Sequence, residues 1–193
     1  MEDFIGRYNC PTEICDGLIQ HFNDNKEQQK DGVTGSFNSS LVNKEFKESN
    51  DFTFHLHDSL WHSNSAIQSY NKHLFECVEN YCKKYTMLDR VNPFTLTEVT
   101  NIQSYPISGG YKVEHCERGG LFDKTIKRIL VFMTYLNDLS DGGTNFKYQG
   151  ITEKAVKGKT LIFPTDWTHT HSGQISHTKE KIIITGWLSH AWD

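Results

Sequence analysis

Hydrophobic residues in the first part of the chain recur at helical spacing. Within residues 11–24, apolar side chains fall three or four positions apart, at Ile14, Leu18, Ile19 and Phe22. Residues 59–85 repeat this spacing over a longer stretch, with apolar or aromatic side chains along one face. The pattern predicts two amphipathic helices, the second of them long. Residues 25–50 are rich in polar residues and glycine, which predicts a loop with a short strand near residues 33–37.

After Pro93 the pattern changes to short runs in which β-branched and aromatic residues alternate with polar ones. We expect strands at residues 94–105, 111–117, 128–136, 146–149, 155–156, 161–163 and 182–185, with Lys181 opening the last. Turns that contain glycine or aspartate separate several of these runs. Helices followed by many short strands favour a mainly β fold, namely an antiparallel β-sandwich or jelly roll braced by the N-terminal helices.

The length of the chain suits one domain with its own hydrophobic core, since it has 193 residues. We expect a single domain over residues 1–193. In this interpretation, residues 1–90 supply mostly helical and loop support, and residues 91–193 form the β core that carries the chemistry.

Composition and charge limit the possible partners. The net charge of −4 gives no general attraction to nucleic acid or to anionic lipid. No apolar run approaches the length of a membrane span, and the N-terminus lacks an apolar signal core. The five cysteines have no disulfide-framework spacing, which fits reduced thiols. We therefore expect a soluble, cytoplasmic protein with neither a nucleic-acid nor a membrane signature; its oligomeric state stays open.

Candidate metal ligands come from two separate segments. If residues 111–117 form a strand, alternation places Tyr111, His115 and Glu117 on one face, so that an imidazole and a carboxylate point the same way. A downstream imidazole, from His169 or His171, would complete two histidines and one carboxylate. This donor set favours an octahedral divalent metal with open positions, and non-haem Fe(II) is its best-known occupant.

Lys181 suggests an acidic co-substrate beside this metal. It opens an apolar strand, and alternation puts it on the same face as Thr185 and Trp187. A buried ammonium is costly unless it meets an anion. A 2-oxo acid can occupy two open metal positions and leave one for O₂, and its far carboxylate would then meet the lysine.

Four groups of residues along the chain also occur in the order and at the offsets found in one enzyme family. They are Tyr105, Gly109–Gly110 and Tyr111; His115 and Glu117; Arg128, Tyr135–Leu136–Asn137 and Gly142–Gly143–Thr144; and His171, Gly173, Lys181 and Trp187. Over roughly residues 94–190 the chain thereby resembles the iron(II)/2-oxoglutarate-dependent oxygenases, in particular their prolyl 4-hydroxylase-like branch. The resemblance implies a double-stranded β-helix, a cupin-like jelly roll, as the core.

The resemblance also implies a role for each of these side chains. His115, Glu117 and His171 would be the iron ligands. Lys181 would bind the distal carboxylate of 2-oxoglutarate. The remaining residues fall into two sets, a co-substrate pocket and a substrate groove. Tyr105, as a hydrogen-bond donor, and Thr144 would share the co-substrate pocket; Tyr111 and Trp187 would flank the substrate, and Arg128 would either reach the site or serve the sheet.

The activity that the resemblance implies is hydroxylation of a C–H bond. Fe(II) activates O₂, and 2-oxoglutarate is decarboxylated to succinate. The resemblance also implies ascorbate as a reductant. The leading substrate is a peptidyl proline or another peptide side chain, within a wider class of peptides, proteins and small molecules. An alternative from another class is a degenerate, cupin-like metal-binding module without turnover. A zinc hydrolase is disfavoured because hydrolysis needs no anchor for a 2-oxo acid.

Two features depart from the family pattern. The carboxylate is Glu117 where the family usually has aspartate, and the gap between Tyr111 and His115 is one residue longer. His169 competes with His171 as the second histidine ligand because the two would share a strand face. The offsets to Gly173 and Lys181 favour His171, which leaves His169 as a supporting partner.

Overall fold

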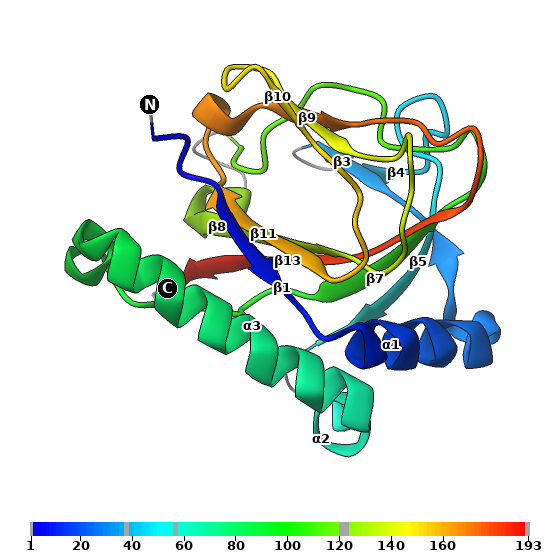
Figure 1. The fold of residues 1–193 in the computed structure, drawn as a ribbon, viewed down its shortest axis with the longest axis horizontal. Coiled ribbons are helices and arrows are strands. Elements are labelled where there is room, and N and C mark those ends of the chain that lie inside the picture. Colours follow the sequence, from blue (N-terminus) through cyan, green and yellow to red (C-terminus); the bar gives the residue numbers. More distant parts are fainter. Residues whose placement is uncertain (1, 37–38, 56–57, 120–123, 192–193) are drawn as a thin grey trace.

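The fold consists of two antiparallel sheets that face each other, with the helices outside (Figure 1). The computed structural model describes residues 2–36, 39–55, 58–119 and 124–191. The main sheet has eight strands, in the order β1-β11-β8-β13-β7-β5-β2, with β6 also paired to β13. Their bounds are β1 Gly6–Asn9, β2 Lys30–Asp31, β5 Asn50–Phe54, β6 Phe94–Thr95, β7 Thr100–Tyr105, β8 Arg128–Tyr135, β11 Lys159–Pro164 and β13 Lys181–His190.

The facing sheet is smaller and has the order β10-β9-β12. Its strands are β9 Thr144–Phe146, β10 Ile151–Glu153 and β12 His171–Gly173. A separate hairpin joins β3 (Thr34–Ser36) to β4 (Ser39–Leu41). The expected helix-braced jelly roll, a double-stranded β-helix, is thus confirmed. The main sheet also takes β1, β2 and β5 from the first ninety residues.

Two hydrophobic layers hold the fold together. The outer layer packs α1 (Thr12–Asp24) and α3 (Ser65–Lys84) on the main sheet, through Leu18, Tyr70 and Leu74 against Phe132 and Ile184 (Figure 1). The inner layer lies between the sheets and contains Tyr135, Phe146, Leu161 and Phe163. Successive side chains of a strand point to opposite faces, so β8 serves both layers and is buried from Leu130 to Tyr135.

The prediction of one long helix over residues 59–85 is wrong in one respect, because this segment forms two helices. α2 (Ser59–Ser63) ends before Asn64, and α3 begins after it. The Asn64 side chain accepts hydrogen bonds from the backbone N–H groups of Ala66 and Ile67, both at 3.0 Å. Asparagine is a strong N-cap because its side chain satisfies these otherwise unpaired donors. The helix expected over residues 11–24 is confirmed as α1.

Several strand boundaries also differ from expectation. Residues 94–105 form two strands, β6 and β7, instead of one, and the strand expected at 155–156 lies earlier, as β10. β3 falls within the strand expected near 33–37, of which Phe37 lies outside the described residues. Short 3₁₀ helices occupy Lys26–Gln28, Thr86–Arg90, Lys124–Lys127 and Trp167–His169 (η1 to η4). None of the helices in the described part of the chain is both long and apolar enough to cross a membrane.

Candidate metal centre

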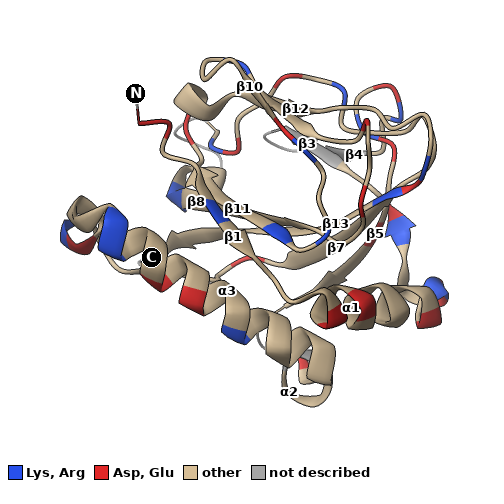
Figure 2. Ribbon diagram, in the orientation of Figure 1, with Lys and Arg blue, Asp and Glu red and all other residues tan. Residues whose placement is uncertain are grey.

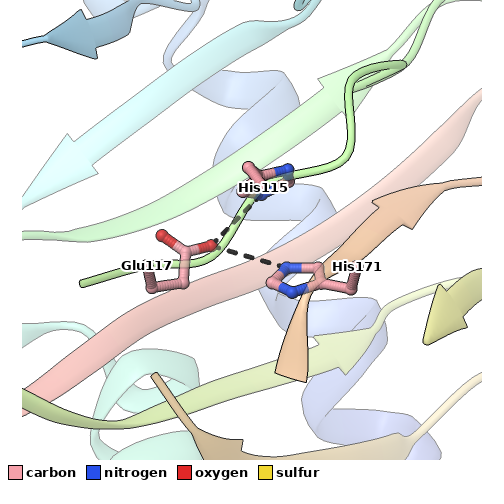
Figure 3. Close-up of side chains that lie close together, drawn as sticks. All are labelled: His115, Glu117 and His171. Carbon is pink, nitrogen blue, oxygen red and sulfur yellow. Dashed lines mark ion pairs between the residues drawn. The ribbon is translucent and has the colours of Figure 1, made fainter. Parts of the chain in front are cut away.

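Three side chains converge between the two sheets (Figure 3). The Nε2 atoms of His115 and His171 lie 3.4 Å and 3.6 Å from the same oxygen, Oε1 of Glu117. All three donor atoms lie within 4.8 Å of one another. Within the described ranges, these residues form the single group of three or more His, Cys, Asp or Glu side chains with such an arrangement. The two histidines and the carboxylate expected from the sequence therefore do meet at one point.

The segment that carries His115 and Glu117 is irregular, so the strand expected over residues 111–117 is wrong. It makes only isolated bridges, from Tyr111 to Lys47 and from His115 to His171. The backbones of the two histidines exchange N–H···O bonds of 2.9 Å in both directions. Two residues on, the N–H of Glu117 bonds to the carbonyl of Thr165 at 3.1 Å. These separate backbone hydrogen bonds bring the three donors together, although the segment does not pair continuously with a neighbouring strand.

Backbone carbonyls set the tautomers of both imidazoles. Nδ1 of His115 lies 2.8 Å from the carbonyl oxygen of Val113, and Nδ1 of His171 lies 2.9 Å from that of His169. A carbonyl can only accept, so each Nδ1 carries the hydrogen and each Nε2 turns an electron pair toward Glu117. While both rings are neutral, three electron-pair donors face one another, an arrangement that suits a cation between them. This is the chemistry of a divalent metal site with open positions.

Charge couples the three groups even without an ion. Burial alone would lower the pKa of His115, but its interaction with the Glu117 carboxylate outweighs burial and raises that pKa. Burial alone would raise the pKa of Glu117, but the two imidazoles hold it well below its usual range. The carboxylate is therefore ionised over the whole physiological range, as a metal ligand must be.

The second carboxylate oxygen of Glu117 is fixed by two residues from the main sheet. Oε2 accepts a hydrogen bond from the Trp187 indole N–H at 3.0 Å and lies 3.5 Å from Nη1 of Arg128. The Arg128 guanidinium stacks over the Trp187 ring, 3.6 Å from its centroid, and forms a two-point ion pair with Glu98. Oε1 is thereby left free to face the histidines. Trp187, expected beside the substrate, and Arg128, expected to reach the site or serve the sheet, both contact the Glu117 carboxylate.

His169 and His171 do not share a strand face, because His169 ends η4 and His171 begins β12. The imidazole of His169 is buried away from the three donors, with Nε2 3.0 Å from the carbonyl oxygen of Asp3. Its contribution to the site is its own carbonyl, which orients His171. The Tyr111 ring stacks on the imidazole of His115, with 3.8 Å between their centroids.

Lys181 is a buried ammonium that has no counter-ion in the described part of the chain. Its side chain is only 5% exposed, and Nζ makes one long hydrogen bond, of 3.4 Å, to the carbonyl of Gln174. Burial lowers the pKa of Lys181 to about 8. A Cβ atom on Gly173 would lie 3.2 Å from Nζ, so the glycine leaves room for the ammonium. These features distinguish Lys181 from a surface lysine, because a buried ammonium is costly unless it meets an anion.

The other two residues expected around the co-substrate, Tyr105 and Thr144, come from strands next to those of Lys181 and Gly173. Tyr105 pairs with it across β7 and β13, and Nζ lies 5.3 Å from the centroid of the Tyr105 ring. The Tyr105 hydroxyl donates to Oε1 of Gln103 at 2.7 Å. Thr144 pairs with Gly173 across β9 and β12, and its hydroxyl lies 2.6 Å from that of Tyr135. Tyr105 and Thr144 are both buried.

The partners that orient the three donors have little or no signal in the sequence. The carbonyls of Val113 and His169 are backbone groups, which carry no side-chain signal. Glu98, which anchors Arg128, lies between β6 and β7 in a stretch that was expected to be strand. Tyr135 was part of the motif but was not assigned to the pocket, although its hydroxyl contacts Thr144.

A double-stranded β-helix that brings two histidines and a carboxylate together defines a class of non-haem metal enzymes. Residues 100–189 match the family model of the 2OG-Fe(II) oxygenase superfamily, and this segment contains all three donors and Lys181. The matched segment is just under half of the chain, and this segment belongs to the superfamily. Together with the fold and the three donors, the match supports an Fe(II)- and 2-oxoglutarate-dependent oxygenase that uses O₂, and the degenerate binding module is not favoured.

Solved structures agree on the fold. A viral collagen prolyl hydroxylase from Paramecium Bursaria Chlorella virus-1, in complex with 2-oxoglutarate, is 17% identical with a TM-score of 0.71, and the match covers 97% of each chain. A prolyl-4-hydroxylase from Pseudomonas putida is 14% identical with a TM-score of 0.69, and the match covers 98% of this chain and 94% of that one.

A prolyl hydroxylase from Trichoplax adhaerens, in complex with a peptide fragment of the hypoxia inducible factor oxygen degradation domain, is 14% identical. Its TM-score is 0.69, and the match covers 97% of this chain and 84% of that one. At sequence identities of 14–17%, the likeness to these structures concerns the fold alone. No curated protein sequence matches the chain.

The bond from Trp187 to Glu117 yields a first prediction. Trp187→Phe keeps a ring for Arg128 but removes the N–H that holds Oε2, so Glu117 can turn away from the histidines. We expect the affinity for Co(II) or Mn(II), measured by isothermal titration, to fall about tenfold, as for other groups that orient a metal ligand. Trp167→Phe is the matched control, because Trp167 is 67% exposed. Equal metal affinity in the two variants would contradict this role.

Proposed function

We propose that the protein hydroxylates a C–H bond of a peptide, with a prolyl side chain as the leading target, and that His115, Glu117 and His171 hold its Fe(II). One observation carries the proposal. Three donors that need a cation lie in the same interior as a buried ammonium that needs an anion. A divalent metal together with 2-oxoglutarate would satisfy both requirements. A hydrolase would account for the donors but not for Lys181.

The residues of the chain orient and isolate the reactants. When bound, Fe(II) supplies the activation of O₂ that couples decarboxylation of 2-oxoglutarate to hydroxylation. Lys181 supplies the positive charge for the distal carboxylate, and Tyr105 and Thr144 wall the same pocket. Arg128 and Trp187 keep Glu117 turned toward the histidines. Because the pocket residues are buried, water is kept from the charged groups, which strengthens their interactions.

The proposal that the substrate is a peptide is supported by the similar structures and by the position of Tyr111. Two of the similar structures are prolyl hydroxylases named for collagen or for a bound peptide fragment, and their fold spans nearly the whole of this chain. Tyr111, stacked on His115 and only partly buried, would lie at the substrate side of the metal. All five cysteines are free thiols, which supports the expected cytoplasmic location. A need for ascorbate stays a prediction.

The test of this function combines binding with turnover. The protein is loaded anaerobically with Fe(II) and 2-oxoglutarate, and then given O₂ with a proline-rich peptide, the same peptide with alanine for proline, or free proline. We expect succinate formation and a 16-Da mass gain on the proline peptide alone, and neither with His171→Ala. Oxidation of a different substrate, or of none despite 2-oxoglutarate binding, would refute the peptidyl-proline assignment and leave the oxygenase class intact.

Lys181→Met should separate stability from function. The substitution keeps the apolar stem but removes an ammonium that has no counter-ion among the described residues, so the melting temperature should rise. Binding of 2-oxoglutarate to the Mn(II)-loaded protein should weaken at least about thirtyfold, because a buried charge-assisted partner is worth roughly 2–5 kcal/mol. Calorimetry measures both quantities. Unchanged affinity would rule out Lys181 as the anchor.

The affinity for 2-oxoglutarate should also depend on pH. Because burial lowers the pKa of Lys181 to about 8, the free protein carries the charge below this pH and loses it above. Both carboxylates of the co-substrate stay ionised in this range. The dissociation constant should be nearly flat from pH 6.5 to 7.5 and then rise up to about tenfold per pH unit. Lys181→Arg, which cannot lose its charge, is the control and should remove the rise.

A further inference from the structure

A buried polar network adjoins the proposed co-substrate pocket and shares no side chain with the three metal donors. It runs along one face of the main sheet and contains Lys47, Ser49, Asp51, Gln103 and Tyr105, each at most 8% exposed. Asp51 pairs with Gln103 across β5 and β7, and Tyr105 is two residues further along β7, on the same face. The network therefore leads from the edge of the sheet to the tyrosine beside Lys181.

Asp51 is the centre of this network. Its Oδ2 accepts from Nζ of Lys47 at 2.7 Å and from Nε2 of Gln103 at 3.1 Å. Its Oδ1 accepts from the Ser49 hydroxyl at 2.7 Å. Lys47 is held in turn by its backbone, which bridges to Tyr111. Lys47 and Gln103 thus share Oδ2 of the carboxylate, and Ser49 holds Oδ1.

The carboxylate determines which way the amide of Gln103 points. An ionised carboxylate can only accept, so the NH₂ group of Gln103 must face Asp51 and its carbonyl must face Tyr105. The bond of 2.7 Å between that carbonyl and the Tyr105 hydroxyl can then be made only with the tyrosine as donor. A phenol has one proton, and here it is directed at Gln103. The tyrosine oxygen is left with electron pairs only.

The same hydroxyl lies within electrostatic range of the metal centre. Burial raises the pKa of Tyr105 well above its usual value, and the negative charges of Asp51 and Glu117 raise it further. Lys181 lies over the ring of this tyrosine. The Tyr105 oxygen therefore stands between the network and the site proposed for 2-oxoglutarate. Its proton is the one hydrogen that could turn from Gln103 to a bound carboxylate.

We propose that Lys47, Asp51 and Gln103 act as positioning residues that turn the Tyr105 proton away from the co-substrate pocket. The inference rests on the proposed binding of 2-oxoglutarate beside Lys181. It revises the expected role of Tyr105, which lines the pocket without donating to the carboxylate. The network thereby sets the affinity for the co-substrate below what the same pocket would reach with a free tyrosine proton. Lys47 and Asp51 lie outside the segment that the family model matches.

The experiment measures 2-oxoglutarate binding to the Mn(II)-loaded protein without turnover. Gln103→Met removes the acceptor while Asp51 keeps Lys47 and Ser49, so the tyrosine proton is released toward the pocket. We expect about tenfold tighter binding, the scale of one hydrogen bond to a charged group. Tyr105→Phe alone should change the affinity less than about threefold, because its proton is already engaged. The double variant should return to the affinity of Tyr105→Phe, since the gain depends on the hydroxyl.

Thr53→Val is the matched control. It removes the hydrogen bond of 2.8 Å from Thr53 to Asn101, which joins the same two strands but does not reach Tyr105. Its 2-oxoglutarate affinity should equal that of the wild type. Structural damage would weaken binding, so a Tyr105-dependent gain cannot arise from it.

Two results would overturn the inference: a loss of tenfold or more in Tyr105→Phe, or an affinity in Gln103→Met no higher than in the wild type. Wild-type protein that binds Mn(II) but no 2-oxoglutarate would instead refute the proposed function, before any variant is compared.

Discussion

The structure depends on an electrostatic imbalance that the fold holds in place. Two imidazole electron pairs and a carboxylate oxygen face one point, while an ammonium is buried nearby without an anion in the described part of the chain. The three donors and the ammonium are the two halves of this imbalance, and each is unfavourable alone, since a buried charge costs several kcal/mol unless it is paired. The jelly roll holds both halves, because β13 supplies Lys181 and Trp187 and the facing sheet supplies His171. A cation and a dicarboxylate would neutralise the two halves together.

The departure from aspartate to glutamate can be understood in the same terms. A glutamate has one more rotatable bond than an aspartate, so it needs more restraint to present one oxygen. Trp187 and Arg128 supply this restraint at Oε2, and Glu98 fixes Arg128 in turn. The reciprocal bonds between His115 and His171 fix the backbone on the opposite side. The longer side chain is therefore compatible with a defined donor set.

The sequence identified the groups whose chemistry is carried by side chains. His115, Glu117, His171 and Lys181 could be found because their residue types and offsets are informative, and the structure brings the first three together. It did not reveal the carbonyls that set the imidazole tautomers, since every residue has one. The irregular backbone at residues 111–117 also escaped prediction, because its shape is determined by bonds to residues about fifty positions away. The helices and the layer architecture followed from periodicity, except where Asn64 caps a new helix.

The residues around the site divide into two kinds. Those in contact with the metal donors lie within the segment shared with the superfamily, where the geometry of three ligands leaves little freedom. Lys47, Ser49 and Asp51 come from outside that segment, and Asp51 reaches the pocket through the pairing of β5 with β7. A hydrogen bond that is oriented by a remote carboxylate can change without moving a ligand. Variation in the N-terminal strands can therefore tune how tightly the co-substrate is held while the donor set stays fixed.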